Sequence, residues 1–345
     1  MSGSDLLSCL RGEGSSVVPS FLYDTSLGTA YADIDIRDIY RDGFDAELSA
    51  RSISASRRVL GHDGVIGSLL CTDCRAFGAE YSYLPDRQPM LVRPAFYDPY
   101  DMYEHSPNDM DTGTMDECII SYRLVREYEP DAAIAATIPS VLLMAATNRG
   151  IEPLLMDMMV DEGYFSDLMD FSRGVVDYVS KRMFDESGAD FVIIPGAYDN
   201  VDLIGLDALK EFCIPDLKRI HTRCKDNGLD AVLHPHGVLT SDIGKKALDS
   251  FIEIGFECIY YGENNDHSVI GGLCEDRVVT MGGVDSATTI FLGPDERVIG
   301  DTQHVLDAMR DRDFIYTCSC SVDRGLDLHR MGLMMDIVKG ASVVR

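Results

Sequence analysis

Residues 191–237 read FVIIPGAYDNVDLIGLDALKEFCIPDLKRIHTRCKDNGLDAVLHPHG, and this stretch alternates two short apolar runs with one long amphipathic segment. The runs FVIIPG (191–196) and AVLHPH (231–236) have the length and composition typical of buried strands. Between them, residues 205–228 place apolar side chains three and four positions apart and stop at Gly228, as a helix does. A strand, a helix and a second strand in this order predict two parallel strands joined by a helical crossover.

The same rhythm covers most of the chain. Six further apolar runs predict strands at residues 17–23, 64–70, 132–139, 258–262, 278–285 and 314–320. Residues 293–313 repeat the helical pattern. Eight strands with helical crossovers predict an α/β fold, a (β/α)8 TIM barrel with an N-terminal extension, better than an open doubly wound sheet, which stays the alternative.

One stretch breaks this rhythm. Residues 71–118 are rich in Pro, Asp and Tyr, so we expect a long excursion over one face of the barrel. No internal repeat, low-complexity tract or Ser/Gly linker divides the chain. Residues 1–345 are therefore predicted to form a single domain.

The chain is strongly acidic, with 58 Asp and Glu against 30 Lys and Arg and a formal net charge of −28. This charge would repel a nucleic-acid backbone and an anionic membrane, so we expect neither as a partner. A solvated acidic surface explains the balance most simply. A salt-adapted host or a basic partner protein would also fit.

Ten cysteines are scattered along the chain without the dense spacing of a small disulfide scaffold, which indicates a reducing compartment. The first residues, MSGSDLLSCLRGEG, carry an acid and glycines where a signal peptide needs a basic start and an apolar core. No apolar stretch of about 18 residues follows. We therefore expect a cytoplasmic protein.

Polar side chains lie at the carboxyl ends of the predicted strands, where the βα loops of a TIM barrel build the active site. They are His234 and His236, Glu263, Asp285, Cys318 and Cys320. Strand residues two apart point to the same side, so the two histidines can reach one ion, and the two cysteines are likewise paired in direction. A catalytic zinc keeps three nitrogen, sulfur or oxygen ligands from the protein and one open position. The histidines and one of the cysteines satisfy that count, although each pair by itself is also compatible with ordinary packing.

The other local motifs give weaker evidence of function. Cys71 and Cys74 form a C-x-x-C that would suit a redox pair or a second zinc site, but no second C-x-x-C accompanies them, and buried or incidental thiols are the simpler interpretation. The chain has no G-x-x-x-x-G-K-[ST], no G-x-S-x-G and no complete G-x-G-x-x-G opening a helix. Nucleotide-binding and serine-hydrolase functions thus have no local support.

Six segments, in order along nearly the whole chain, resemble the uroporphyrinogen decarboxylase superfamily. They are LRGEGSSVVPSF (10–21), HDG (62–64), RAFGAEYSYLPDRQPMLVRPAFYDPYDM (75–102), IPSVLLMAATNRGIEPLLMDMMVDEGYFSDLMDF (138–171), ESGADFVIIPG (186–196) and MGGVDSATTIFLGPDERV (281–298). Each segment alone would be weak, and together they are specific. Members of this superfamily are (β/α)8 barrels, so the resemblance implies the fold that the strand count predicts.

The superfamily has two branches to weigh. The porphyrinogen decarboxylases carry an arginine-bearing segment after the first strand, because their substrate is a polycarboxylate. The matching residues here, FLYDTSLGTAYAD (21–33), include no Arg or Lys, and an anionic tetrapyrrole would meet Asp24 and Asp33. The resemblance therefore favours the corrinoid-dependent methyltransferases, which include methylcobalamin:coenzyme M methyltransferases and related demethylating enzymes.

In that branch an H-x-C-G after the fifth strand and a G-C-x-[IV] at the eighth hold zinc, and this chain has HPHG at 234–237 and SCSV at 319–322. The resemblance implies His234 and Cys320 as ligands, with His236 where the family has cysteine. Two neutral imidazoles and one thiolate leave Zn²⁺ with a charge of +1, whereas one imidazole and two thiolates leave it neutral. This departure weakly favours a site that activates a methyl donor over one that activates a thiol.

The function implied is a zinc-dependent methyl transfer between a corrinoid, either methylcobalamin or a corrinoid protein, and a small substrate. That substrate is a thiol such as coenzyme M as acceptor, or a methylated ether, alcohol or amine as donor. Glu263 could fill the open zinc position at rest or be a loop acid, and Asp285 could bind a ligand at the rim or cap a helix. The resemblance also implies a corrinoid-binding protein as partner. A metal-free lyase and a non-catalytic partner of a corrinoid protein are the alternatives.

Overall fold

The computed structural model describes residues 3–41, 43–70, 73–85 and 87–341, and it contains one parallel sheet of seven strands in the order β1-β4-β5-β6-β7-β8-β9. These strands are β1 (Gly64–Ile66), β4 (Ala133–Thr137), β5 (Phe191–Gly196), β6 (Asp230–Pro235), β7 (Cys258–Tyr260), β8 (Val279–Val284) and β9 (Phe314–Cys318). Each is buried almost throughout, as parallel strands covered by crossover helices must be. All seven coincide with strands that the sequence predicts.

The eighth predicted strand, residues 17–23, lies between the first and last strands of the sheet. Ser20 bridges Tyr316 of β9, and Phe21 bridges Gly64 of β1, both in parallel orientation. The Phe21 amide donates to the Tyr316 carbonyl at 2.9 Å, and the Gly64 amide donates to the Ser20 carbonyl at 3.0 Å. Pro19 lacks an amide hydrogen, so this segment cannot extend the ladder in full. The (β/α)8 prediction is confirmed, with one strand reduced to isolated bridges.

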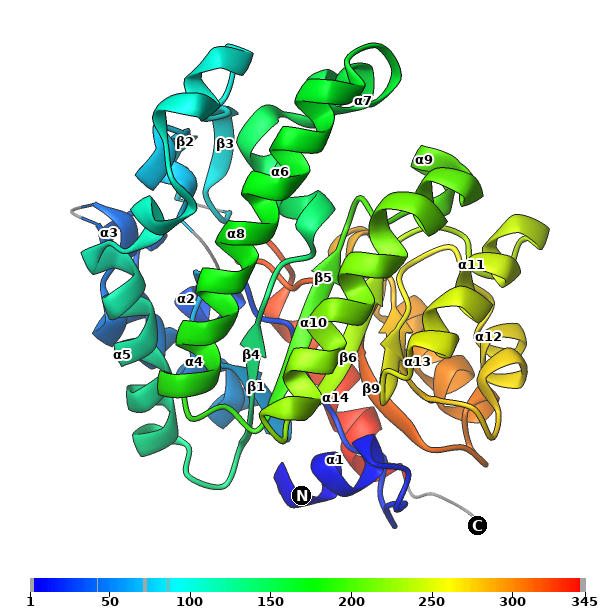
Figure 1. The fold of residues 1–345 in the computed structure, drawn as a ribbon. Helices are drawn as coiled ribbons and strands as arrows, with labels where there is room; N and C mark the ends of the chain where they lie inside the picture. Colours follow the sequence, from blue (N-terminus) through cyan, green and yellow to red (C-terminus); the bar gives the residue numbers. More distant parts are fainter. Residues whose placement is uncertain (1–2, 42, 71–72, 86, 342–345) are drawn as a thin grey trace.

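Fourteen α-helices surround the sheet in the described part of the chain (Figure 1). They are α1 (Gly3–Leu10), α2 (Leu27–Tyr31), α3 (Ile36–Tyr40), α4 (Ala46–Leu60), α5 (Gly113–Tyr128), α6 (Val141–Arg149), α7 (Ile151–Val160), α8 (Glu162–Glu186), α9 (Val201–Ala208), α10 (Ile214–Asp226), α11 (Asp242–Ile254), α12 (His267–Cys274), α13 (Asp295–Ala308) and α14 (Leu328–Gly340). No helix of this part of the chain is long and apolar enough to cross a membrane.

The helix predicted over residues 205–228 is wrong at its start and in its continuity. Helix α9 already begins at Val201, where the Asn200 side chain accepts from the Asp202 amide. Gly205 then leaves helical geometry at φ 77°, a value that favours glycine, and a π-helical turn covers Leu209–Cys213 before α10 begins. The helix predicted over 293–313 is shorter, because α13 begins after Pro294 and ends at Ala308.

The N-terminal extension and the excursion occupy opposite ends of the barrel. Helix α1 lies below the strands in Figure 1, and the Gly3 amide donates to the Asp131 carbonyl at 2.8 Å just before β4. The excursion forms the antiparallel hairpin β2 (Glu80–Ser82) and β3 (Met90–Arg93) and three 3-10 turns, η1 (Cys74–Phe77), η2 (Pro99–Glu104) and η3 (Pro107–Met110). It ends at Gly113, where α5 begins, so the predicted boundary at 118 is wrong.

Arg149 holds the excursion against the barrel. Its guanidinium donates to the Phe96 and Tyr97 carbonyls at 2.9 and 2.7 Å and to the Asp157 carboxylate at 2.7 Å. It also lies over the Tyr164 ring, 5.4 Å from the centroid. One buried cation thus joins the excursion, α7 and α8 at the upper end of the barrel (Figure 1).

Candidate metal centre

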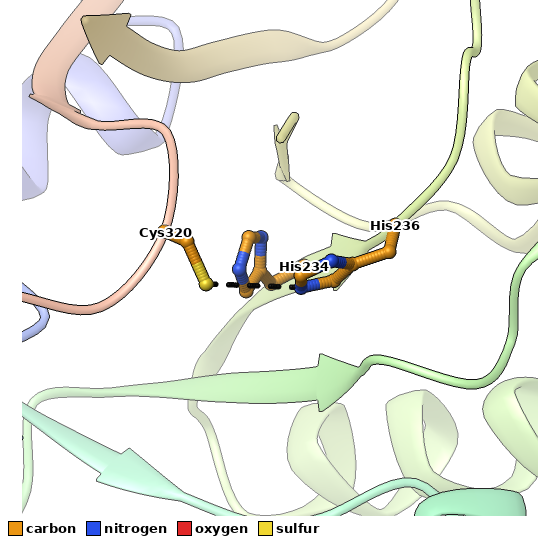
Figure 2. Close-up of side chains that lie close together, drawn as sticks. All are labelled: His234, His236 and Cys320. Carbon is orange, nitrogen blue, oxygen red and sulfur yellow. Dashed lines mark hydrogen bonds between the residues drawn. The ribbon is translucent and has the colours of Figure 1, made fainter. Parts of the chain in front are cut away.

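The three predicted ligands meet at the carboxyl end of the barrel strands. His234 is the second-last residue of β6, His236 follows that strand directly, and Cys320 lies two residues past the end of β9. Their ligand atoms all lie within 4.8 Å of one another, and Cys320 Sγ is 3.9 Å from His236 Nε2 (Figure 2). Among the described residues, these three form the single group of His, Cys, Asp or Glu that could hold a metal ion.

His234 presents one ring nitrogen to this cluster. Its Nδ1 lies 2.8 Å from the Tyr260 carbonyl, which can only accept, so Nδ1 carries the hydrogen and Nε2 carries the lone pair. Nε2 is buried and has no hydrogen-bond partner among the described residues. Burial lowers the pKa of His234 to about 4, so the imidazole is neutral at pH 7. A neutral imidazole oriented through its other nitrogen is the state that a metal ligand requires.

Tyr260 positions the His234 ring, a role that was not predicted from the sequence. The two rings stack with centroids 3.8 Å apart and planes 18° apart. The Tyr260 hydroxyl donates to the Cys318 carbonyl at 2.9 Å, two residues before Cys320. One side chain of β7 therefore contacts both His234 and the end of β9, the strand that leads to Cys320. Its signal in the sequence was a tyrosine at the end of the strand between the two ligand-bearing strands.

Only one of the two cysteines faces the histidines. Cys318 is fully buried, and its Sγ lies 3.9 Å from Met334 Sδ of α14, outside the strands. Cys320 is partly exposed and points to His236 (Figure 2). The prediction that both thiols point to one side is wrong, because β9 ends at Cys318 and the period of two no longer applies beyond it. The choice of Cys320 agrees with the cluster.

Asn265 joins the loops that follow β6 and β7, and it too was missed. Its buried Nδ2 lies 3.1 Å from the Gly237 and Gly262 carbonyls and 3.2 Å from the Glu263 carbonyl. Its Oδ1 accepts from the Thr240 amide at 3.2 Å. The backbone after His236 is thus bonded to the backbone around Glu263. An amide-rich run such as ENND was the available signal.

Glu263 is half-buried next to His234, and its negative charge acts to raise the pKa of that histidine against the larger effect of burial. The glutamate is outside the cluster formed by the three ligand atoms. Asp285 precedes the π-helical turn Ser286–Phe291, and its carboxylate accepts from the Ala287 and Thr288 amides at 2.8 Å each. These are the contacts of a helix cap, the structural alternative weighed for this residue.

The surroundings of the segment 21–33 differ from what its sequence predicts. Asp24 is buried and accepts from the Gly28 amide at 3.0 Å, and burial raises its pKa to about 6. Asp33 is exposed. Arg324 lies against the same segment and donates to Thr29 Oγ1 at 3.0 Å. A cation from a distant part of the chain thus stands beside a segment that contains none, and it serves to hold that segment in place.

Cys74, from the C-x-x-C motif, belongs to no such cluster among the residues that the structure describes. Cys74 is buried, with Sγ 3.9 Å from Met144 Sδ, and burial raises the pKa of its thiol to about 12. A buried thiol that stays protonated is a poor nucleophile. Cys71 lies outside the described residues.

Known proteins resemble this chain in sequence and in structure. Over 267 residues it is 22% identical to the methylcobamide:CoM methyltransferase MtbA of Methanosarcina mazei, an alignment that covers 76% of each chain. A solved structure of a methyltransferase from Methanosarcina mazei superposes with a TM-score of 0.80 over 98% of both chains, at 17% identity. No protein-family model matches. The resemblance to the corrinoid-dependent methyltransferase branch of the uroporphyrinogen decarboxylase superfamily is thereby confirmed, and the structural likeness confirms the barrel fold.

Proposed function

We propose that this chain is a zinc-dependent methyltransferase that moves a methyl group between a corrinoid and a small substrate. The comparisons support a corrinoid-dependent methyltransferase in general terms. The observation that supports zinc is the cluster of His234, His236 and Cys320, in which the buried His234 Nε2 has no hydrogen-bond partner among the described residues. A buried polar atom without a partner costs free energy, and an ion bound there would remove that cost.

The donor set suits zinc. Two imidazole nitrogens and one thiolate sulfur are preferred zinc ligands, and three protein ligands leave a position for substrate. Zinc held there would lower the pKa of a bound thiol or withdraw charge from a leaving oxygen or nitrogen. The protein supplies orientation, since Tyr260 fixes the His234 ring and Asn265 fixes the loop that follows His236. It also excludes water from one side of the site, because His234 is fully buried.

His236 bears on the direction of transfer. With two neutral imidazoles and one thiolate, the site would keep a net charge of +1 on zinc. Such a centre stabilises a bound thiolate and so makes it less nucleophilic, while it assists the departure of an oxygen or nitrogen leaving group. We therefore favour a methylated ether, alcohol or amine as methyl donor over a thiol such as coenzyme M as acceptor. Glu263 is positioned near His234 and would be the residue that occupies the open zinc position at rest.

The corrinoid would be supplied by a partner protein. The strand ends that carry the cluster open to the upper end of the barrel, opposite α1 (Figure 1). A corrinoid-binding protein docked at that end would place its cofactor against the small substrate. A cytoplasmic location would keep the scattered cysteines of this chain reduced.

Metal analysis combined with methyl exchange tests this proposal. We expect one zinc per chain in the purified wild type, loss of that zinc in His236→Ala, and retention in the control His304→Ala, which removes an exposed imidazole outside the cluster. Methyl transfer to or from free cobalamin should follow zinc content. Full activity in zinc-free protein would overturn the proposal. Activity on a carboxylated substrate that survives His236→Ala would indicate the metal-free lyase instead.

A further inference from the structure

Helix α7 carries apolar side chains that the protein leaves uncovered. Its sequence is IEPLLMDMMV, yet only Leu154 and Asp157 are buried. Met156, Met159 and Val160 are 57, 79 and 73% exposed. An apolar helix that does not bury its own side chains marks a surface that another molecule covers.

Aromatic residues of the excursion extend this surface. Tyr97, Tyr100 and Tyr103, in and just before η2, are all exposed, with Tyr100 at 79%. Arg149 links the two parts, because it donates to the Tyr97 carbonyl and to the Asp157 carboxylate of α7. We call these six exposed residues, Met156, Met159, Val160, Tyr97, Tyr100 and Tyr103, the rim patch.

The rim patch lies at the same end of the barrel as the metal centre. The excursion connects β1 to α5, and α7 lies in the connection from β4 to α8, so both belong to βα connections. Such connections lie at the carboxyl ends of the strands, where His234 and Cys320 are found. Figure 1 shows α7 and the excursion above the strands, opposite α1.

The surroundings of the rim patch are acidic. Residues 94–112 contain five Asp and Glu, residues 150–172 contain six, and neither segment contains Lys or Arg. Asp98, Glu104, Glu152, Asp161 and Glu162 are exposed among them. The neighbouring cations are engaged, since Arg149 pairs with Asp157, and Arg93 pairs with Glu80 and lies over the Tyr97 ring.

This charge decides between possible occupants. A second copy of the chain would bring the same acids against the patch, at a net charge of −28 per chain, and like charges would repel. An anionic membrane would be repelled in the same way. A protein whose apolar docking face is ringed by Lys and Arg is attracted, and flexible methionines and amphipathic tyrosines are suited to such a protein interface.

We infer that the rim patch docks the corrinoid-binding protein through an apolar surface ringed by basic residues; the identity of this partner rests on the proposed function. The exposed acids around the rim patch, Asp98, Glu104, Glu152, Asp161 and Glu162, form an acidic ring that would steer the encounter. The apolar side chains would hold the complex. The docking surface therefore accounts for part of the excess of acid over base in this chain.

The test separates docking from catalysis. In Met156→Asp/Met159→Asp, both side chains are exposed and outside the metal centre, so the fold and the zinc site should persist. Calorimetric titration with the purified corrinoid-binding protein of the same organism should show a dissociation constant raised at least about tenfold. Methyl transfer with free cobalamin should stay within about twofold of wild type. Val59→Asp on α4, exposed to 60%, is the matched control and should leave both unchanged.

A second experiment tests the role of the acidic ring. Binding of the wild type should weaken as salt rises, and Glu104→Gln/Glu162→Gln should reduce that salt dependence while it weakens binding at low salt by roughly twofold to fivefold. Wild-type dissociation constants retained by the methionine variant would overturn the inference. So would a dimeric wild type that the same variant makes monomeric, since the second copy would then be the occupant. Failure of the wild type to transfer methyl both with free cobalamin and with the corrinoid-binding protein would instead refute the proposed function.

Discussion

Replacement of Asn265 tests whether the metal centre depends on the loops around it. Its amide has two N–H donors aimed at three carbonyls, those of Gly237, Gly262 and Glu263, and one oxygen that accepts from the Thr240 amide. At most about three of these bonds are made in full at once, and each contributes roughly 0.5–1.5 kcal/mol. Asn265→Ala should therefore lower the free energy of unfolding by roughly 2–4 kcal/mol.

Asn265→Asp should be worse, although it is nearly isosteric. The carboxylate keeps the acceptor for Thr240 but places negative charge against three carbonyl oxygens that the amide now serves as donor. A buried charge without donors costs more than a missing bond. The loop that follows His236 would then be less well held, and we expect zinc affinity to fall by about 10- to 100-fold in both variants.

Two measurements check this. Urea unfolding in the presence of a chelator reports the stability of the metal-free fold, and competition with a chromophoric chelator reports the zinc dissociation constant. Asn108→Ala, an exposed asparagine of η3, is the control and should change neither. If Asn265→Asp equals the wild type in stability, the assigned amide contacts are wrong. If stability falls but zinc affinity does not, the residue has no role in positioning the ligand loop.

Three further outcomes follow from the geometry. Cys320→Ser should lose zinc. Cys318→Ser should keep zinc but lower the free energy of unfolding by roughly 1–3 kcal/mol, because a hydroxyl replaces a buried thiol beside Met334. If Cys320→Ser keeps zinc and Cys318→Ser loses it, the assignment of the ligand is reversed. His236→Cys should keep one zinc per chain, now without net charge, and should raise kcat/KM for a thiol acceptor relative to an oxygen or nitrogen methyl donor; an unchanged ratio in paired assays would refute the charge argument. Burial raises the pKa of Asp199 to about 6, above its ordinary value of 3.8, so the protonated acid stabilises the fold, an effect present in full below pH 3.8 and lost as pH rises through 6. Asp199→Asn should therefore gain up to roughly 3 kcal/mol on the wild type between pH 4 and pH 7 in urea unfolding, and parallel stability profiles for the two proteins would contradict this.

The barrel could be predicted because each strand and helix carries its own period. Buried parallel strands read as short apolar runs, and all seven ladder strands coincide with such runs. The same reasoning could not show that residues 17–23 form only isolated bridges, since pairing depends on neighbours that are distant in sequence. The break in the helix at Gly205 could not be predicted from the sequence either, because glycine is compatible both with a helix and with positive φ.

The candidate site, too, could be predicted from the sequence only in part. Side chains at the carboxyl ends of strands must share one rim in a barrel, so His234, His236 and Cys320 could be brought together from the sequence and the resemblance alone. The direction of Cys318 was decided only by the end of β9, where the alternation of strand side chains stops. The tautomer of His234 was decided by the Tyr260 carbonyl on the adjacent strand.

The sequence by itself thus determined the order of strands and helices, the acidity of the chain, and the two histidines and two cysteines that include the candidate metal ligands, because these follow from local period and composition. Tertiary structure alone decided which thiol faces the histidines, that Tyr260 stacks on His234 and Asn265 holds the loop after His236, and that the apolar side chains of α7 stay exposed. A methionine in an apolar helix looks the same in a sequence whether it is buried or uncovered. Only packing distinguishes the two, because burial depends on the elements that lie next to it in space.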